Sequence, residues 1–118
     1  MADFTVPAGD ATHQVFQHHL GAFAQGLDEI LKDYDEHSVL VTPEKTYRGL
    51  AAIRGFFKVF LDGADPGFWA AFGITSQSVE GEIAYLAWEA KPWVALATDT
   101  LFVKNGKIAV QTFTSFSA

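Results

Sequence analysis

The chain has 118 residues, of which 49% are hydrophobic, and this excludes a disordered polar chain and allows one domain with a buried core. A formal charge of −6, from 14 acidic against 8 basic residues, argues against nucleic acid as a partner, and the lack of cysteine excludes disulfides and thiolate chemistry. The N-terminus lacks the basic start and apolar core of a signal peptide, and no run reaches the ~18 apolar residues of a membrane span. We therefore expect a single cytoplasmic domain over residues 1–118 with no membrane contact.

The first half of the chain carries helical spacing. Residues 1–9 contain Pro and Gly and predict a flexible lead-in. Apolar residues then recur every three or four positions, which predicts a helix from the candidate N-caps Asp10 or Thr12 to about Gln25. Further along, the pattern predicts a short helix over residues 27–34, extended segments over 37–43 and 44–49, and a third helix over 49–62.

Beyond a break at residues 63–67 the periodicity changes from helical to alternating. The dipeptide Asn105-Gly106 is the strongest hairpin signal in the chain. Helices followed by a strand meander predict an α+β domain, with the helices packed on one face of a curved antiparallel sheet. The four predicted strands of the meander cover residues 68–81, 82–91, 93–104 and 107–116.

One ionisable residue, Asp99, lies in the middle of an otherwise apolar or Thr-containing strand, WVALATDTLFV. An unpaired charge in an apolar interior costs several kcal/mol, so such a group is usually paired, protonated or functional. Alternation places Asp99 on the same face as Ala97 and Leu101, and both faces of the strand are largely apolar. We expect one face to line the interior and the other to be covered by a second copy of the chain, giving a homodimer.

Three stretches carry a resemblance to known proteins: GLDEILKDYDEHSVLVTP, YRGLAAIRGFF and TDTLFVKNGKIAVQTF. They resemble the nuclear-transport-factor-2-like superfamily, which includes SnoaL-like polyketide cyclases, ketosteroid isomerase, scytalone dehydratase and limonene-epoxide hydrolase. The resemblance extends from about residue 10 to residue 117 and implies an α+β, cystatin-like cone, in which a curved antiparallel sheet wraps around three N-terminal helices and an apolar pocket opens at one end. One such scaffold hosts several activities and purely binding proteins, so the activity has to be argued from the site.

The resemblance implies which side chains line this pocket. Aligned on DTLFVKNGK, Asp99 falls where ketosteroid isomerase carries a protonated aspartic acid that donates a hydrogen bond to the developing enolate. Tyr34 falls where several members of the superfamily place active-site residues, and it also lies in a polar exit from a helix. Pocket-lining positions of the later strands fall on Leu86, Trp88, Gln111 and Phe113.

The isomerase has a second oxyanion donor, a Tyr in its first helix, and two histidines compete for that position. His19 takes it if one residue is absent from the following turn, and His18 takes it without a gap. His19 is three residues after Phe16 and four before Phe23, so it flanks the apolar stripe of the helix. By the same geometry His18 points away from the stripe, and we expect His19 to face the pocket.

Two departures from the superfamily narrow the activity. The alignment puts Thr42 at the position of the isomerase's catalytic Asp, and a threonine hydroxyl cannot act as that base without an activator. It also puts Ala97 where limonene-epoxide hydrolase carries an Arg. The mechanisms of the steroid isomerase and of the epoxide hydrolase are therefore both disfavoured.

The sequence thus predicts a small-molecule-binding SnoaL-like domain, with a cofactor-independent isomerase, dehydratase or cyclase for a small apolar carbonyl compound as the leading hypothesis. The alternative is a noncatalytic domain that binds a hydrophobic ligand or serves in dimeric assembly. No grouping of His, Asp and Glu has the spacing of metal ligands, so we expect neither a metal nor a cofactor. Asp99 and His19 are the expected catalytic residues. The expected substrate-binding residues are Tyr34, Thr42, Phe57, Leu86, Trp88, Gln111 and Phe113.

Overall fold

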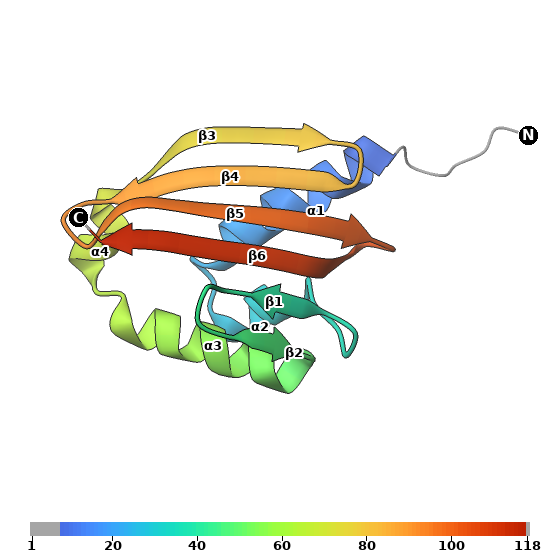
Figure 1. Ribbon diagram of the computed structural model, residues 1–118, viewed down its shortest axis with the longest axis horizontal. Coiled ribbons are helices and arrows are strands. Elements are labelled where there is room, and N and C mark those ends of the chain that lie inside the picture. Colours follow the sequence, from blue (N-terminus) through green and yellow to red (C-terminus); the bar gives the residue numbers. More distant parts are fainter. Residues whose placement is uncertain (1–7, 118) are drawn as a thin grey trace, which may run out of the picture.

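The computed structural model describes residues 8–117, which build one curved sheet with helices packed against it (Figure 1). This is an α+β fold, as the sequence predicts. Most of the predicted lead-in, residues 1–7, lies outside the described residues, and Ala8 and Gly9 already belong to the first helix. The described helices are α1 (Ala8–Ala22), α2 (Leu27–Leu31), α3 (Leu50–Gly63) and α4 (Pro66–Ala71).

The described strands are β1 (Val39–Val41), β2 (Thr46–Arg48), β3 (Phe72–Glu80), β4 (Ile83–Ala90), β5 (Val94–Lys104) and β6 (Lys107–Ser117). They form one sheet in the order β2-β1-β6-β5-β4-β3, with the short pair β1 and β2 at one edge (Figure 1). Neighbouring strands are antiparallel except β1 and β6, which run parallel, so the sheet is mixed rather than wholly antiparallel as predicted. These two strands come from distant parts of the chain, and no local turn encodes their relative direction.

The structure corrects the prediction of a strand over residues 68–81, because helix α4 occupies its first part. Asp65 caps this helix by accepting a hydrogen bond from the backbone N–H of Phe68 at 2.9 Å, and Pro66 stands in its first turn. The strand begins only at Phe72. The Asp-Pro dipeptide is thus a helix start inside a stretch for which the sequence pattern predicts a loop and a strand.

The boundaries of two predicted helices also differ from the structure. Helix α1 begins at Ala8, ahead of Asp10 and Thr12, so neither of these is its N-cap, and it ends at Ala22. Helix α2 ends at Leu31, and the next residues up to Tyr34 donate backbone hydrogen bonds to the residue three positions earlier, as in isolated turns. Both helices thus end about three residues before the predicted position, because apolar spacing continues past the last helical turn.

The hairpin between β5 and β6 turns at Asn105 and Gly106, which confirms the prediction, and these residues have φ of 53° and 75°. Positive φ at both central residues is typical of the two-residue turn whose twist suits a hairpin. The hairpin pairs Asp99 with Phe113 across the two strands. The turn therefore helps to set which side chains meet at the middle of the sheet.

Burial alternates along β5, so that every second residue from Ala97 to Val103 is buried. Asp99 is one of these residues and points to the inner face of the sheet, the face that it shares with Ala97 and Leu101 as strand parity predicts. Helix α1 packs on β3, β4 and β5, and α4 packs on β4 (Figure 1). The opposite face of the sheet carries no helix in Figure 1 and is called the outer face below.

The Gly106→Ala variant should lose about 1 kcal/mol or more of unfolding free energy, because a side chain at φ 75° is strained. Gly63→Ala at the end of α3 is the matched control, since open space surrounds the position of its Cβ and this variant should be neutral or slightly stabilising. Urea unfolding of both variants beside the wild type measures the difference. Equal stability of the two variants would contradict the role given to the turn.

Candidate active site

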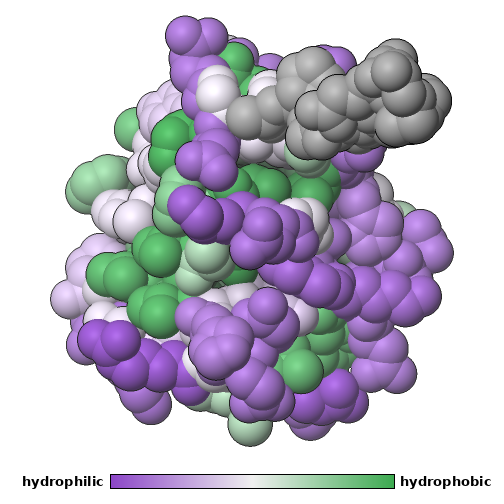
Figure 2. Space-filling view, turned by 90° about the vertical axis from the view of Figure 1, so that its right-hand side faces the viewer, coloured by the Kyte–Doolittle hydropathy of each residue, from purple (hydrophilic) through white to green (hydrophobic). Residues whose placement is uncertain are grey.

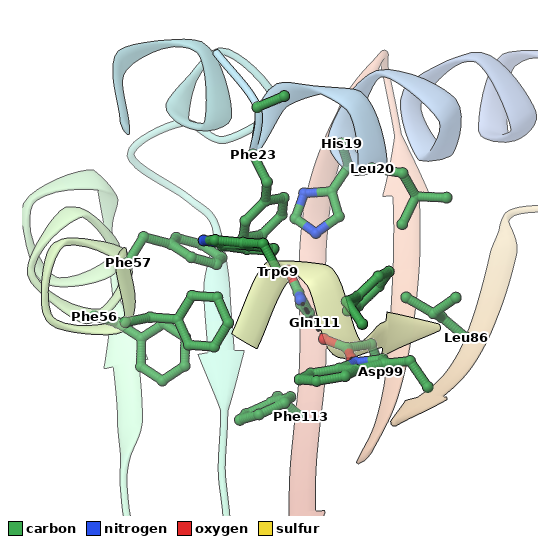
Figure 3. Close-up of a pocket in the computed structure, with 14 residues that line it drawn as sticks. His19, Leu20, Phe23, Phe56, Phe57, Trp69, Leu86, Asp99, Gln111 and Phe113 are labelled. Carbon is green, nitrogen blue, oxygen red and sulfur yellow. Dashed lines mark hydrogen bonds between the residues drawn. The ribbon is translucent and has the colours of Figure 1, made fainter. Parts of the chain in front are cut away.

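A cavity of about 500 Å³ lies between the inner face of the sheet and helices α1, α3 and α4 (Figure 3). This volume is within the range of small-molecule sites. In Figure 3, His19 of α1 and Phe23, just after α1, reach into the cavity opposite Asp99 and Phe113 on the sheet. Three of its fourteen lining residues are polar and eight are aromatic. The lining residues are His19, Leu20, Phe23, Ala24, Phe56, Phe57, Phe60, Trp69, Phe72, Leu86, Trp88, Asp99, Gln111 and Phe113.

Asp99 is the acidic residue of this set, and it is 7% exposed. The indole Nε1–H of Trp88 donates a hydrogen bond to its Oδ1 at 2.9 Å, and the amide Nε2–H of Gln111 donates to its Oδ2 at 2.9 Å. Both donors lie on the strands that flank β5, at positions diagonal to Asp99 and within reach of long side chains. Each carboxyl oxygen therefore has one neutral N–H donor, and none of the ion pairs among residues 8–117 involves Asp99.

Burial raises the pKa of Asp99 from 3.8 to about 6. The hydrogen bonds from Trp88 and Gln111 stabilise the carboxylate and limit this rise. At pH 7 the group is therefore mostly ionised, whereas the resemblance implies an acid that stays protonated. A carboxyl group that gains and loses its proton close to neutral pH is suited to acid–base chemistry.

Tyr34 contacts Gln111 and is not part of the cavity wall. Its hydroxyl donates a hydrogen bond to Oε1 of Gln111, and the residue is 3% exposed. Burial raises the pKa of Tyr34 well above its ordinary value, and the negative charges of Asp99 and Asp33 add to the effect, so the side chain stays a phenol. A chain of hydrogen bonds thus connects Tyr34 through Gln111 to Asp99.

His19 lines the cavity opposite the sheet and is 3% exposed. Its ring makes edge contacts with the rings of Phe23, Tyr34 and Phe57, and its Nδ1 has no hydrogen-bond partner in the described part of the chain. Burial lowers the pKa of His19 from 6.5 to about 4, and the neighbouring His18 adds to the effect. At neutral pH the ring is uncharged, so one nitrogen donates and the other accepts.

His18 is directed to a different part of the molecule and bridges two carboxylates. Its Nε2 lies 2.6 Å from Oε2 of Glu29, and its Nδ1 lies 2.7 Å from Oδ2 of Asp33. These hydrogen bonds, led by the one to Glu29, raise the pKa of His18. Of the two candidate histidines, His19 is the one in the cavity wall, and His18 ties α1 to α2.

Most residues of the predicted site lie in the cavity wall. Thr42 does not, because it follows β1 in the turn toward β2, where its hydroxyl donates to the backbone oxygen of Lys45 at 2.8 Å. Thr42 therefore lies apart from the cavity, whereas Tyr34 lies behind its wall and contacts two of the lining residues, Gln111 and His19. The predicted residues in the wall are His19, Phe57, Leu86, Trp88, Asp99, Gln111 and Phe113.

The sequence did not decide which aromatic residues form the cavity wall rather than the core or an interface. Phe23, Phe56 and Phe60 lie at apolar positions of helical spacing in the sequence, and this spacing indicates only that such residues face inward. Trp69 and Phe72 come from α4 and the start of β3, and α4 was not predicted. Whether an inward-facing ring meets a neighbour or an open space depends on tertiary packing.

No protein-family model matches the sequence, and no curated protein matches it. Solved structures do match. A nuclear-transport-factor-2-like protein of unknown function from Mesorhizobium loti superposes with a TM-score of 0.76 at 15% identity, over 96% of this chain and 97% of that chain. This chain has the nuclear-transport-factor-2-like fold.

Two further structures with this fold match most of the chain. A SnoaL-like protein of unknown function from Burkholderia thailandensis has a TM-score of 0.71 at 14% identity, over 95% of this chain and 100% of that chain. A candidate ketosteroid isomerase from Kribbella flavida has a TM-score of 0.71 at 12% identity, over 97% of this chain and 84% of that chain. At these identities the likeness establishes the fold and leaves the activity to the site.

The chemistry open to the cavity comes from its three polar side chains. Asp99 can take up or release a proton, and the neutral ring of His19 can donate a hydrogen bond. Gln111 is already bound to Asp99 and Tyr34. Within residues 8–117, no cluster of three or more His, Asp or Glu could hold a metal ion. No helix of that part of the chain is long and apolar enough to cross a membrane.

Asp99 and His19 should affect stability with opposite signs between pH 4 and 6. Asp99 holds its proton more tightly in the folded state, so its contribution to the unfolding free energy falls by about 3 kcal/mol as pH rises from 3.8 to about 6. His19 releases its proton more readily in the folded state, so its contribution rises by about 3 kcal/mol from pH 4 to 6.5. The two effects nearly cancel in the wild type.

Single variants should reveal this cancellation in urea unfolding at pH 4, 5, 6 and 7. Relative to the wild type, Asp99→Asn should gain stability as pH rises, because it lacks the falling contribution. His19→Phe should lose stability over the same range, because it lacks the rising contribution. Each variant serves as the control for the other, and curves that both parallel the wild type would show that neither group is buried as described.

Proposed function

We propose that the protein binds a small, largely apolar carbonyl compound in the cavity and moves a proton within it without a cofactor. The observation that carries this proposal is a buried carboxyl group with neutral donors only, in the wall of an aromatic cavity of about 500 Å³. The apolar rings favour a ligand that is itself mainly apolar. A carboxylate that reversibly binds a proton would let the cavity catalyse proton transfer in addition to binding the ligand.

Asp99 acts in this proposal as a base that later returns its proton. Its carboxylate takes a proton from the carbon next to the ligand carbonyl, and the electron pair of the broken C–H bond moves into the carbonyl group to form an enolate. The new carboxylic acid then gives the proton back to another carbon of the conjugated system. Atoms and charge balance without a co-reactant, and the pKa of about 6 makes both directions accessible near neutral pH.

His19 supplies the hydrogen bond to the ligand oxygen. The ring is neutral at pH 7, because its pKa is about 4, and it stabilises an enolate as a hydrogen-bond donor rather than as an acid. A neutral histidine in this role is a known pattern of enzyme sites. The unpartnered Nδ1 shows that the ring is not fully used by the described residues.

The fold supports this class of reaction by analogy, since one neighbour is described as a candidate ketosteroid isomerase. The position of Thr42 outside the cavity wall argues against that enzyme's arrangement of base and donor, so the base proposed here is Asp99 instead. A cavity filled by its own side chains would favour the noncatalytic alternative. The cavity is instead open, with Phe57, Trp88 and Phe113 on its walls.

The exchange of ketone α-protons in D₂O tests the activity. A panel of cyclic and β,γ-unsaturated apolar ketones is followed by NMR with the wild type, Asp99→Asn and the surface control Val59→Ala, since Val59 is 75% exposed on α3. Wild type should accelerate exchange for some members, with a rate that rises with pH through about 6, because only the carboxylate accepts a proton.

Asp99→Asn should exchange at least about 100-fold more slowly, and the control should match the wild type. If Asp99→Asn keeps the full exchange rate, Asp99 is not the base. If no ketone binds or exchanges with the wild type, the noncatalytic alternative replaces the proposal.

We also propose that the chain forms a homodimer through the outer face of the sheet. Leu96 and Phe116 are paired on β5 and β6 and are 42% and 59% exposed. Apolar residues of this face tend to be buried in an interface, because exposed apolar patches mark interaction sites. Figure 2 views the molecule from one end and shows hydrophobic side chains at the surface between hydrophilic ones. Further exposed apolar residues on the strands are Val41, Ile83, Tyr85 and Val110.

Light scattering at micromolar concentration should give twice the chain mass of 12.9 kDa. Phe116→Glu should give the monomer mass, because it puts a charge on the apolar outer face. Val59→Glu is the matched control on α3 and should stay dimeric. A monomeric wild type would contradict the proposed assembly.

A further inference from the structure

The two protein groups that contact the Asp99 carboxyl are not equivalent as hydrogen-bond partners. The indole N–H of Trp88 can only donate. The amide of Gln111 has both a donor and an acceptor end, and it presents its donor end, Nε2–H, to Asp99. In this arrangement a proton bound to Asp99 finds no acceptor on either of these groups.

The orientation of the Gln111 amide depends on Tyr34. The phenol O–H of Tyr34 donates to Oε1 of Gln111, which leaves only the NH₂ end for Asp99. If the amide turned by half a revolution, its oxygen would face Asp99. That orientation would repel a carboxylate and would bind the proton of a carboxylic acid in an internal hydrogen bond.

We propose that Tyr34 is a positioning residue, whose hydroxyl fixes the Gln111 amide so that Asp99 meets only donors and a proton on Asp99 is directed to the ligand. This inference rests on the proposed function and deepens it, because a group that shuttles a proton must give the proton back to the substrate. Without the hydrogen bond from Tyr34, which we call the Tyr34 lock, Asp99 would share its proton with the oxygen of Gln111. It would then transfer the proton to the ligand less readily. Tyr34 acts without touching the ligand, since it lies outside the cavity wall.

Other groups near Asp99 do not replace this lock. His19 faces the same cavity from α1 and is uncharged at neutral pH, because burial lowers its pKa to about 4. The helices α3 and α4 contribute only aromatic side chains to the wall. Burial raises the pKa of Tyr34 well above its ordinary value, the charges of Asp99 and Asp33 add to this, and the hydroxyl stays protonated. The donors on β4 and β6 are the Trp88 and Gln111 groups described above.

The test is the pKa of the Asp99 carboxyl, measured by carbon-detected NMR titration in the wild type and in Tyr34→Phe. This variant removes one oxygen and keeps the ring that packs against Phe57 at 5.6 Å between centroids, so the fold should be retained. The pKa of Asp99 should rise by about one unit, because the freed amide can turn its oxygen to the carboxylic proton. Tyr85→Phe, on the exposed side of β4, is the matched control and should leave the pKa unchanged.

A second pair of variants separates positioning from loosened packing. Gln111→Met removes the amide, and Tyr34→Phe added to it should then leave the pKa of Asp99 where Gln111→Met alone puts it. A further rise in the double variant would show that Tyr34 acts by packing, and would overturn the proposal. An unchanged pKa of Asp99 in Tyr34→Phe alone would overturn it too.

These measurements need no substrate, so they are independent of the proposed activity. A rise in the pKa of Asp99 in Tyr34→Phe together with a wild type that exchanges no ketone would support the lock and reject the enzyme. The opposite result, ketone exchange by the wild type and no rise in Tyr34→Phe, would support the enzyme and reject the lock. If the enzyme and the role of Tyr34 are both supported, the pH–rate profile of Tyr34→Phe should shift to higher pH by as much as the pKa of Asp99 rises.

Discussion

The site depends on a carboxyl group that is buried between two neutral N–H donors and forms no ion pair within residues 8–117. Burial raises the cost of its charge, and the hydrogen bonds from Trp88 and Gln111 lower that cost, so the pKa of Asp99 comes to lie near 6. A cationic partner would have kept the carboxyl group ionised far below neutral pH. Burial without hydrogen-bond donors would have kept it protonated above neutral pH. With Trp88 and Gln111 as its donors, Asp99 changes its charge near neutral pH.

The position of that group is a consequence of strand register. Asp99 is central in β5, and its two donors stand diagonally on β4 and β6, so all three meet only in one alignment of the three strands. A slip of one residue would turn Asp99 to the outer face of the sheet. The Asn105-Gly106 turn opens the β5–β6 hairpin and is therefore connected to the chemistry of the cavity, although it lies at the far end of the two strands.

Local patterns in the sequence predicted the parts of the site that depend on periodicity. Alternation placed Asp99 on one face with Ala97 and Leu101, the resemblance assigned Asp99 to the pocket, and helical spacing favoured His19 over His18. Patterns of this kind could not predict helix α4, whose start is set by the cap at Asp65, nor the parallel pairing of β1 with β6. The link from Tyr34 to Asp99 is a tertiary contact over 65 residues of sequence, and no spacing rule anticipates it.

The pKa of the Asp99 carboxyl in the wild type tests the central claim most directly. Carbon-detected NMR titration with Asp99→Asn for assignment should give a value near 6, well above the ordinary 3.8. A value at or below 3.8 would mean that a charged partner or solvent reaches the group. The carboxyl would then be an ordinary ionised side chain, and the proton-transfer role proposed for the cavity would lose its basis.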